Sequence, residues 1–336
     1  MKVTMEDIAQ LSGVSKATVS YVLNRKPSSL GLSDKTVMKV LETSRQLNYR
    51  PDAVAVALSQ QKNLPLSLLI LSPWLYTQFS DFMAQVNRTL RSISDERPLK
   101  VSYELFHPGL LQKKLTVSKL SKYNAVLVLG TTSADDLLLQ KRANKFTNLV
   151  LLNREVSGYP CSYGNDLEVC RCMAERIARR GYYQRYVLAC GKERSHCEQK
   201  RLKGFAEGLE KHGASFDFVD LDGALTAQQQ VLELFSRCHH ERPILFFMPQ
   251  YHPAALLLNL LQEKAVSVPE TVGIACYDRH SLLSDFLRPE LTTIDPNIEE
   301  MTRNAILIAQ TIKEGGKTEN YISHGSFVPG GTSIIA

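Results

Sequence analysis

Short apolar runs alternate with helical patterns from residue 66 to residue 277 of this 336-residue chain, and this alternation restricts the fold more than any other feature. The runs span 66–71, 101–106, 125–129 and 149–152, and then 186–190, 216–221, 244–248 and 272–277. A continuous apolar run of this length is typical of a strand covered on both faces. Such strands between helices predict parallel, doubly wound sheets of the α/β class.

The two sets of runs predict two similar halves, each of roughly 130 residues around one sheet. Helical patterns over 79–93, 136–145, 167–180, 201–212, 227–237 and 253–264 separate the runs. Small ligands of such folds bind beyond the carboxyl ends of the strands. The expected ligand site therefore lies in the cleft between the halves.

The composition is that of a globular protein, because 44% of the residues are hydrophobic and 22% are charged. No stretch approaches the ~18 uninterrupted apolar residues of a membrane helix, and Glu6 and Asp7 stand where a signal peptide would be apolar. The seven cysteines, none of them before Cys161, are not laid out as a disulfide framework. We therefore expect a cytoplasmic protein with free thiols and no membrane partner.

The positive charge is concentrated at one end of the chain. Residues 1–62 hold nine Lys or Arg against five acidic residues, which is +4 of the chain's total of +6. This asymmetry favours a polyanion-binding module on a nearly neutral body. A small, merely solvated domain would show the same charge, so charge alone leaves both interpretations open.

The basic end has the pattern of three short helices. Thr4 begins a capping box and Gly13 ends a first helix, while Ser15 and Ser33 can cap a second and a third. The apolar positions that recur at helical spacing are Met5, Ile8 and Leu11, then Val19, Val22 and Leu23, and finally Val37, Val40, Leu41 and Leu47. Two helices joined by a tight turn and braced by a third predict a helix-turn-helix, whose second helix reads a major groove.

The segments 4–9, 12–24 and 47–51 together resemble the headpiece of the lactose-repressor (LacI/GalR) family of bacterial transcription regulators. The resemblance implies a helix-turn-helix headpiece over 1–50, a hinge helix and linker over 51–63, and a periplasmic-binding-protein-like core over 64–336. It implies base contacts from Lys16, Ala17 and Tyr21. It also implies phosphate contacts from Thr4, Ser15, Thr18, Ser20, Asn24, Ser33 and Thr36, because hydroxyls and helix N-termini donate to phosphate without sequence preference.

Three departures from the family pattern bear on DNA binding. Tyr21 replaces the usual Arg, which makes a bidentate guanine contact that Tyr cannot make, so a different operator half-site is expected. The loop over 25–32 is about three residues longer than usual. Asp52 replaces the usual Asn, and an acid near phosphates weakens binding.

Residues 52–60 are helix-compatible but too short to form a stable isolated helix, since helices under about 12 residues are marginal in water. They resemble the family's hinge helix, which folds when two copies pair in the minor groove. Leu58 then has the position of the apolar wedge, and small Ala55 permits close approach of the backbone. An alanine-rich linker is the alternative.

The segments 201–205, 268–270, 276–278 and 291–294 resemble the core of the same family. An N-subdomain over about 64–155 and 289–319 and a C-subdomain over about 156–288 and 320–336 are implied. The implied effector-binding residues are Gln78, Phe79, Asp166, Arg201, Gln250, Tyr251 and Asp278. Arg201 could instead be an exposed helix charge, and Phe79 a core residue.

Charged groups and an aromatic face suit a polyhydroxylated ring, so a sugar-like effector is expected. Many sugar-binding members carry Asn-Asp where this chain has Gln250 and Tyr251. One carboxylate is thus missing, so the prediction of an ordinary hexose as the effector is less well supported. The sequence leaves the effector's identity open. It also leaves open whether the effector weakens or strengthens DNA binding.

Few motifs in the sequence point to a nucleotide site or a metal site. The segment 314–318 imitates the end of a phosphate loop but follows a helix rather than opening one. Cys170 and Cys172, or Cys238 beside His239 and His240, lack the paired spacing of a zinc site. We therefore expect no metal, no cofactor and no catalytic residues.

Three classes of function are weighed: an effector-controlled DNA-binding regulator, a ligand-binding protein of the periplasmic type, and an enzyme. The second gives no reason for residues 1–60, and the third lacks an identifiable nucleophile or acid/base pair. The resemblance implies a nucleoid-associated regulator, most often a repressor, that binds a pseudo-palindromic operator. A homodimer is expected, since no leucine heptad of the kind that ties two dimers together follows residues 329–336.

The wedge role of Leu58 predicts that Leu58→Ala weakens binding to a specific duplex more than binding to a nonspecific one, since only the specific complex holds the opened base step. Titration of both duplexes at one salt concentration measures the two losses. Equal losses would contradict the wedge role.

Overall fold

The computed structural model describes residues 4–23, 32–47, 49, 64–73, 81–143, 145–192, 194–238, 243–280 and 283–335. The chain divides into two compact units, Met1–Leu64 and Pro65–Ala336. The predictions for Asn24, Ala55, Leu58, Gln78 and Phe79 lie outside the described residues.

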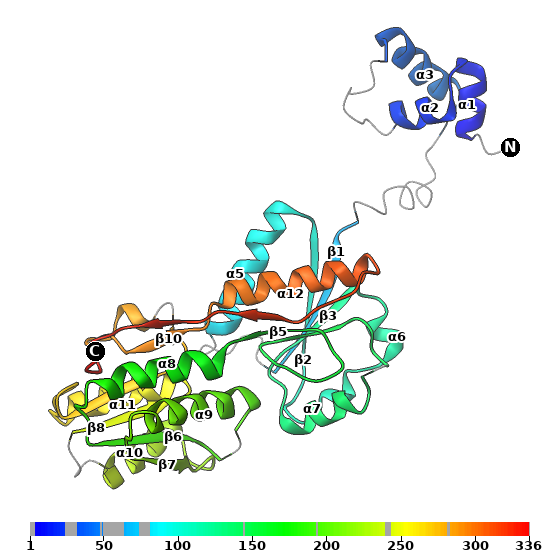
Figure 1. The fold of residues 1–336 in the computed structure, drawn as a ribbon. Helices are drawn as coiled ribbons and strands as arrows, with labels where there is room; N and C mark the ends of the chain where they lie inside the picture. Colours follow the sequence, from blue (N-terminus) through cyan, green and yellow to red (C-terminus); the bar gives the residue numbers. More distant parts are fainter. Residues whose placement is uncertain are drawn as a thin grey trace. The chain divides into compact units, whose positions relative to one another are not determined.

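The first unit contains the three expected helices, α1 (Met5–Ser12), α2 (Lys16–Leu23) and α3 (Asp34–Gln46) (Figure 1). The Thr4 side chain accepts a hydrogen bond from the backbone N–H of Asp7, and the Asp7 carboxylate accepts one from the Thr4 N–H at 2.7 Å. Gly13 ends α1 in the left-handed region at φ 66°, which glycine adopts without strain. The predicted capping box and helix end are confirmed.

A small apolar core holds these helices together. Ile8, Val19 and Val40 are fully buried, one from each helix, and Val22 is buried beside them. Helices of eight residues are marginal alone, so this shared core stabilises them. The opposite face of α2 remains free of core contacts at Lys16 and Ala17, which are exposed.

The second unit begins with a six-stranded sheet in which every pairing is parallel. In the order of the sheet its strands are β11 (Tyr321–Ser323), β5 (Cys161–Gly164), β4 (Leu149–Leu152), β3 (Ala125–Val128), β1 (Leu66–Ser72) and β2 (Leu99–Leu105). One face packs on α5 (Asp81–Glu96) and α12 (Ile298–Lys313), and the other on η2 (Leu111–Lys113), α6 (Val117–Leu120) and α7 (Ser133–Gln140). Figure 1 shows α5 and α12 side by side.

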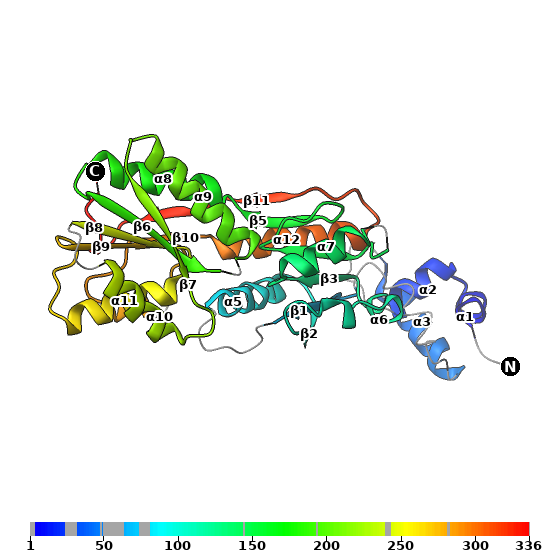
Figure 2. The same cartoon turned by 90° about the horizontal axis from the view of Figure 1, so that it is seen from below.

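The second sheet has four parallel strands in the order β7 (Phe216–Leu221), β6 (Arg185–Gly191), β8 (Ile244–Met248) and β9 (Val272–Cys276). α8 (Asp166–Arg179) and α9 (His196–Glu210) cover one face, and α10 (Ala227–Cys238) and α11 (Tyr251–Glu263) cover the other (Figure 2). The apolar runs of β6, β8 and β9 are buried on both sides because alternate residues enter opposite cores, whereas the edge strand β7 is partly exposed.

The division between the two sheets differs from the one that the resemblance implies. β5 and β11 were expected in the C-subdomain, but both pair in the six-stranded sheet. These strands are only four and three residues long, so their own sequence carries little strand signal. A further antiparallel pair, β10 (Thr293–Asp295) and β12 (Ser326–Val328), lies on the segments that connect the sheets.

α8 and α9 approach closely at two glycines. A Cβ atom on Gly204 of α9 would overlap the carbonyl oxygen of Leu167, and one on Gly208 would lie 2.5 Å from the carbonyl oxygen of Arg171. The close approach brings Asp166, at the start of α8, against Arg201 of α9. The glycines therefore help to place a buried ion pair.

Gly204→Ala is expected to lower the free energy of unfolding by about 1–3 kcal/mol through overpacking, although alanine is the better helix former. Urea denaturation of the full chain measures the change. The control is Gly223→Ala, where an added Cβ meets nothing within 4 Å, and a change below about 0.5 kcal/mol is expected there. An unchanged or raised stability of Gly204→Ala would contradict the close helix contact.

Candidate functional site

The first unit presents a polar face along α2. Lys16 and Ala17 at its start are exposed, and Tyr21 one turn later is half-buried. Lys16 Nζ forms an ion pair at 2.9 Å with Glu6 of α1, and this hydrogen bond raises the lysine's pKa. The candidate base-reading residues thus lie on one face, with the cationic end of Lys16 held by α1.

The candidate phosphate-binding hydroxyls gather at the starts of the helices. Ser15 Oγ accepts from the backbone N–H of Thr18 at 3.1 Å, and Ser33 Oγ accepts from that of Thr36 at 3.3 Å. Thr4 caps α1 in the same manner, and Ser20 is half-buried on α2. The orphan N–H groups and the positive end of the helix dipole both favour an anion at such positions.

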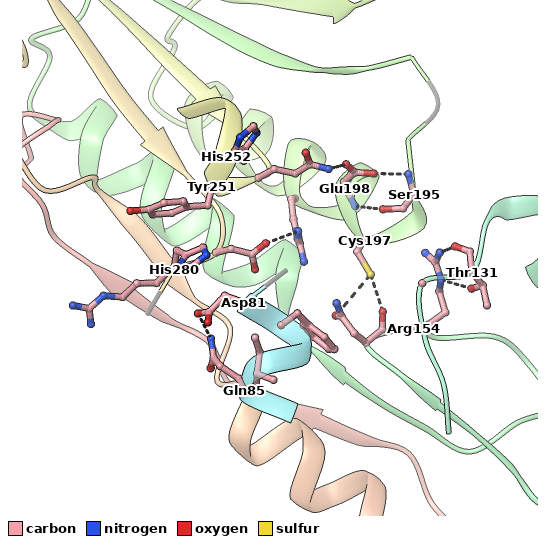
Figure 3. Close-up of a pocket in the computed structure, with 18 residues that line it drawn as sticks. Asp81, Gln85, Thr131, Arg154, Ser195, Cys197, Glu198, Tyr251, His252 and His280 are labelled. Carbon is pink, nitrogen blue, oxygen red and sulfur yellow. Dashed lines mark hydrogen bonds and ion pairs between the residues drawn. The ribbon is translucent and has the colours of Figure 1, made fainter. Parts of the chain in front are cut away.

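A cavity of about 480 Å³ lies in the second unit, and its wall draws on both sheets and their helices (Figure 3). The residues from the first sheet's side are Asp81, Phe82, Gln85, Gly130, Thr131, Asn153, Arg154 and Ile298. Those from the second sheet's side are Ser195, Cys197, Glu198, Arg201, Gln250, Tyr251, His252, Asp278, Arg279 and His280. Most of the positions outside the helices follow strand ends, where ligands of parallel sheets bind.

Arg201 forms the base of the cavity on the second side. Its side chain is nearly fully buried. The guanidinium donates from Nε to Asp166 Oδ2 at 3.2 Å and from Nη1 to the Pro249 carbonyl at 3.0 Å. Its central carbon lies 3.6 Å from the centre of the Tyr277 ring. The Tyr277 hydroxyl donates to Asp166 Oδ1 at 2.6 Å. Asp166 is therefore behind Arg201 and orients it without lining the cavity.

Asp278 follows β9 with a left-handed φ of 72°, a conformation that Asp and Asn adopt more readily than most residues. Its carboxylate lies 3.8 Å from Arg201 Nη1, and its side chain is 40% exposed. Desolvation in the cleft raises the pKa of Asp278 from the ordinary 3.8 to about 6. The positive charge of Arg201 opposes this shift, and the negative charges of Asp166, Asp81 and Glu198 add to it. The Asp278 carboxyl therefore binds a proton more readily than an exposed aspartate does.

Glu198 is a second acceptor on this side. It accepts from the backbone N–H of Ser195 at 2.7 Å, as the capping box of α9, and from Gln250 Nε2 at 2.5 Å. Nearby, the hydroxyls of Tyr251 and Ser284 lie 3.2 Å apart. Gln250 thus ties the end of β8 to the start of α9.

The opposite wall brings together groups from α5 and the ends of β3 and β4. Gln85 Nε2 donates to Asp81 Oδ2 at 2.9 Å. Arg154 Nε donates to Thr131 Oγ1 at 2.8 Å, and Asp136 Oδ2 lies 3.5 Å from the same nitrogen. Figure 3 shows Arg154 beside Thr131, on the far side of Cys197 from Glu198.

The structure brings together four of the seven candidate effector residues, Arg201, Gln250, Tyr251 and Asp278, in the cavity wall. Arg201 is buried, so its alternative interpretation as an exposed helix charge is wrong. Sequence reasoning missed Asp81, Thr131, Asn153, Arg154 and Glu198. The positions directly after the strands at 125–129 and 149–152 could have indicated three of these.

Within the described ranges, no three His, Cys, Asp or Glu side chains lie close enough together to hold a metal ion. In the same part of the chain, no helix combines the length and apolar character that a membrane span requires.

A family model described as bacterial regulatory proteins of the lacI family matches residues 4–52, and one described as a periplasmic binding protein-like domain matches residues 174–333. The chain thus carries a DNA-binding domain of the lacI family of bacterial regulatory proteins and a periplasmic-binding-protein-like domain. The predicted family and fold class are confirmed, and so is the interpretation as a DNA-binding transcriptional regulator.

Curated relatives match this chain over nearly its whole length. The probable HTH-type transcriptional repressor ExuR of Bacillus subtilis is 25% identical over 311 residues, which cover 89% of this chain and 88% of that protein. The HTH-type transcriptional repressor PurR of Vibrio atlanticus is 24% identical over 328 residues, which cover 93% and 92%. Such relatives are transcriptional regulators rather than enzymes.

The fold also matches a solved structure. The Lac repressor dimer bound to operator and the anti-inducer ONPF superposes with a TM-score of 0.70 at 20% identity, covering 99% of this chain and 100% of that one. At this identity the likeness establishes the arrangement of elements and leaves the ligand to be argued from the cavity itself.

Asp278 predicts a pH dependence of stability. Because its pKa is about 6 in the folded chain and about 3.8 ordinarily, the folded state binds more protons between these values. The free energy of unfolding should therefore fall as the pH rises from 4 to 6. The partial exposure of the side chain limits this contribution to below about 1 kcal/mol.

Thermal unfolding of wild type and Asp278→Asn from pH 4 to 7.5 measures this effect. The difference between their melting temperatures should shrink towards low pH, because a protonated Asp278 is neutral, as the Asn is. Asp95→Asn, at the exposed end of α5, is the control and should follow wild type. A constant difference between Asp278→Asn and wild type would contradict the raised pKa.

Proposed function

We propose that this lacI-family regulator binds a pseudo-palindromic DNA operator as a homodimer and that a small, sugar-like effector in the cavity controls the affinity. On this proposal it acts as a repressor on the nucleoid in the cytoplasm and catalyses no reaction. The cavity walled by both sheets, in one chain with a helix-turn-helix, is the observation that carries the proposal.

The first unit supports DNA binding through two sets of groups with separate roles. Lys16, Ala17 and Tyr21 on the outer face of α2 are the proposed base contacts. The capping hydroxyls Thr4, Ser15 and Ser33, with Thr18, Ser20 and Thr36, are the proposed phosphate contacts. Phosphate contacts fix the register on the duplex, and base contacts supply specificity. The proposed hinge residues Ala55 and Leu58 and the phosphate contact Asn24 complete the site.

The second unit supports effector control because its cavity wall comes from two bodies. Thr131, Asn153 and Arg154 belong to the first sheet, whereas Glu198, Arg201 and Asp278 belong to the second. A ligand that contacts both sides favours one relative pose of the sheets over another. A coupling of ~1–3 kcal/mol to DNA binding would change the affinity about 5- to 150-fold.

Two contacts already join the sheets across this cleft. The Cys197 thiol donates to the Asn153 carbonyl at 3.1 Å, and Lys200 Nζ lies 2.7 Å from Glu155 Oε2. Both run from α9 to the loop after β4. We place the effector-sensitive contact between the subdomains there, because a ligand between α9 and this loop changes their spacing directly.

Exposed apolar side chains support the homodimer. Phe286 is 82% exposed, and the edge strands β2 and β7 expose Leu105 and Phe218. Open sheet edges and large exposed apolar side chains are features that a protein–protein interface can cover. A second copy of the chain is the occupant that two-fold symmetric operator binding requires.

Selection of the full-length protein on random duplexes is expected to enrich a pseudo-palindrome. Tyr21→Ala should then change base preference at one position of each half-site, because a base contact is lost. Thr18→Ala is the matched control on the same helix and should weaken all duplexes alike. An unenriched library would overturn the proposal, and uniform weakening by Tyr21→Ala would overturn its base-reading role.

A further inference from the structure

Arg154 is a buried cation with one unsatisfied nitrogen in the cavity wall. Its side chain is 3% exposed, Nε donates to Thr131 Oγ1, and Nη2 donates to the Thr131 carbonyl oxygen. Nη1 has no hydrogen-bond partner among the described residues. Buried polar groups nearly always have a partner, so an orphaned guanidinium nitrogen beside a cavity points to a group that the ligand supplies.

The surroundings of Arg154 fix the direction of this nitrogen. Thr131 holds two of the three guanidinium nitrogens, and Asp136, which lies outside the cavity wall, is 3.5 Å from Nε and balances the charge. The planar guanidinium is therefore held in one orientation, and Nη1 is its nitrogen without a partner among the described residues. An oxygen acceptor would find a preorganised, charge-assisted donor there.

Ser195 supplies a further donor in the cavity wall, beside Glu198. Ser195 Oγ accepts from the Glu198 N–H, which leaves its hydroxyl proton to donate. Burial and the Asp166 carboxylate raise the pKa of the Cys197 thiol to about 11, while Arg201 and Arg154 oppose the shift, so both guanidinium groups act on the space around Cys197.

The cavity wall also holds several acceptors. Asp278, Glu198 and Asp81 are carboxylates in the wall, and they act on one another strongly enough to contribute to the raised pKa of Asp278. Hydroxyl groups of a ligand would donate to these acceptors. A neutral polyol satisfies these acceptors, and an anionic oxygen gives Arg154 Nη1 a shorter and stronger hydrogen bond than a hydroxyl oxygen does.

We propose that the effector carries a carboxylate or phosphate group whose oxygen accepts from Arg154 Nη1, and hydroxyl groups that donate to Glu198 and Asp278. The ligand class is thus a polyhydroxylated acid or a sugar phosphate. This inference rests on the proposed effector function of the cavity and adds the charge of the ligand to it.

Inorganic phosphate is the minimal probe. The ³¹P resonance of phosphate should broaden on addition of the full-length wild type. In Arg154→Gln the affinity derived from this broadening should be at least about 10-fold lower, which is equivalent to ~1.4 kcal/mol. Arg303→Gln is the matched control, because Arg303 lies on α12 outside the cavity wall and pairs with Glu299 at 3.0 Å, and it should behave as wild type. Equal broadening by Arg154→Gln and wild type, or none by wild type, overturns the proposal.

Competition with glucose, glucuronate and glucose 6-phosphate separates the two acid groups, since these sugars differ at one carbon. Glucuronate or glucose 6-phosphate should displace phosphate at concentrations where glucose does not, and the better competitor identifies the acid. Displacement by glucose at the same concentration overturns the proposal. Should Arg154→Gln not fold, Arg154→Lys replaces it; it retains charge without the guanidinium fork and should bind phosphate about 10-fold more weakly than wild type.

Duplex affinity, measured with and without each competitor, distinguishes this inference from the proposed function. Acids that bind through Arg154 without altering duplex affinity would support the anion site and contradict effector control. Glucose that alters duplex affinity equally in wild type and Arg154→Gln would support effector control and overturn the anion site.

Discussion

The second unit depends on how it keeps the Arg201 guanidinium buried. A buried charge without a partner would destabilise the fold by several kcal/mol, and Asp166 at 3.2 Å, the Pro249 carbonyl and the Tyr277 ring together prevent this. These partners come from α8, the end of β8 and the end of β9. The cavity base is therefore fixed by the same contacts that hold the second sheet to its helices, and the close contact at Gly204 makes them geometrically possible.

Eight of the strands could be predicted from the sequence because each is an apolar run between helical patterns, and six of them are buried on both faces; the edge strands β2 and β7 are partly exposed. β5 and β11 could not, because three or four residues acquire strand character only through pairing; the Asn320 side chain, for example, accepts from the Cys161 N–H across 159 positions. The resemblance supplied Arg201 and Asp278. Arg154 was missed because its meeting with Thr131 depends on β3 and β4 lying side by side, which no local pattern encodes.

The charges of the cavity are arranged so that cations have their partners outside and carboxylates face inward. Arg201, Arg154 and Arg279 pair with Asp166, Asp136 and Glu290, none of which lines the cavity. Asp278 and Glu198 remain inside, contacted by Arg201 and Gln250 respectively. Fixed guanidinium groups are oriented by these outer partners, whereas the inner carboxylates remain available for the donors of a ligand.

A ligand with unlike ends is the kind that such a cavity can use for control. Arg154 moves with the first sheet, and Glu198 and Asp278 move with the second. A molecule that satisfies both ends gains its full interaction energy only at one spacing of the two sheets, because hydrogen bonds weaken steeply with distance and angle. A molecule bound to one sheet alone gains the same energy in every pose and shifts no equilibrium. The separation of donors and acceptors across the cleft is thus itself the source of differential affinity.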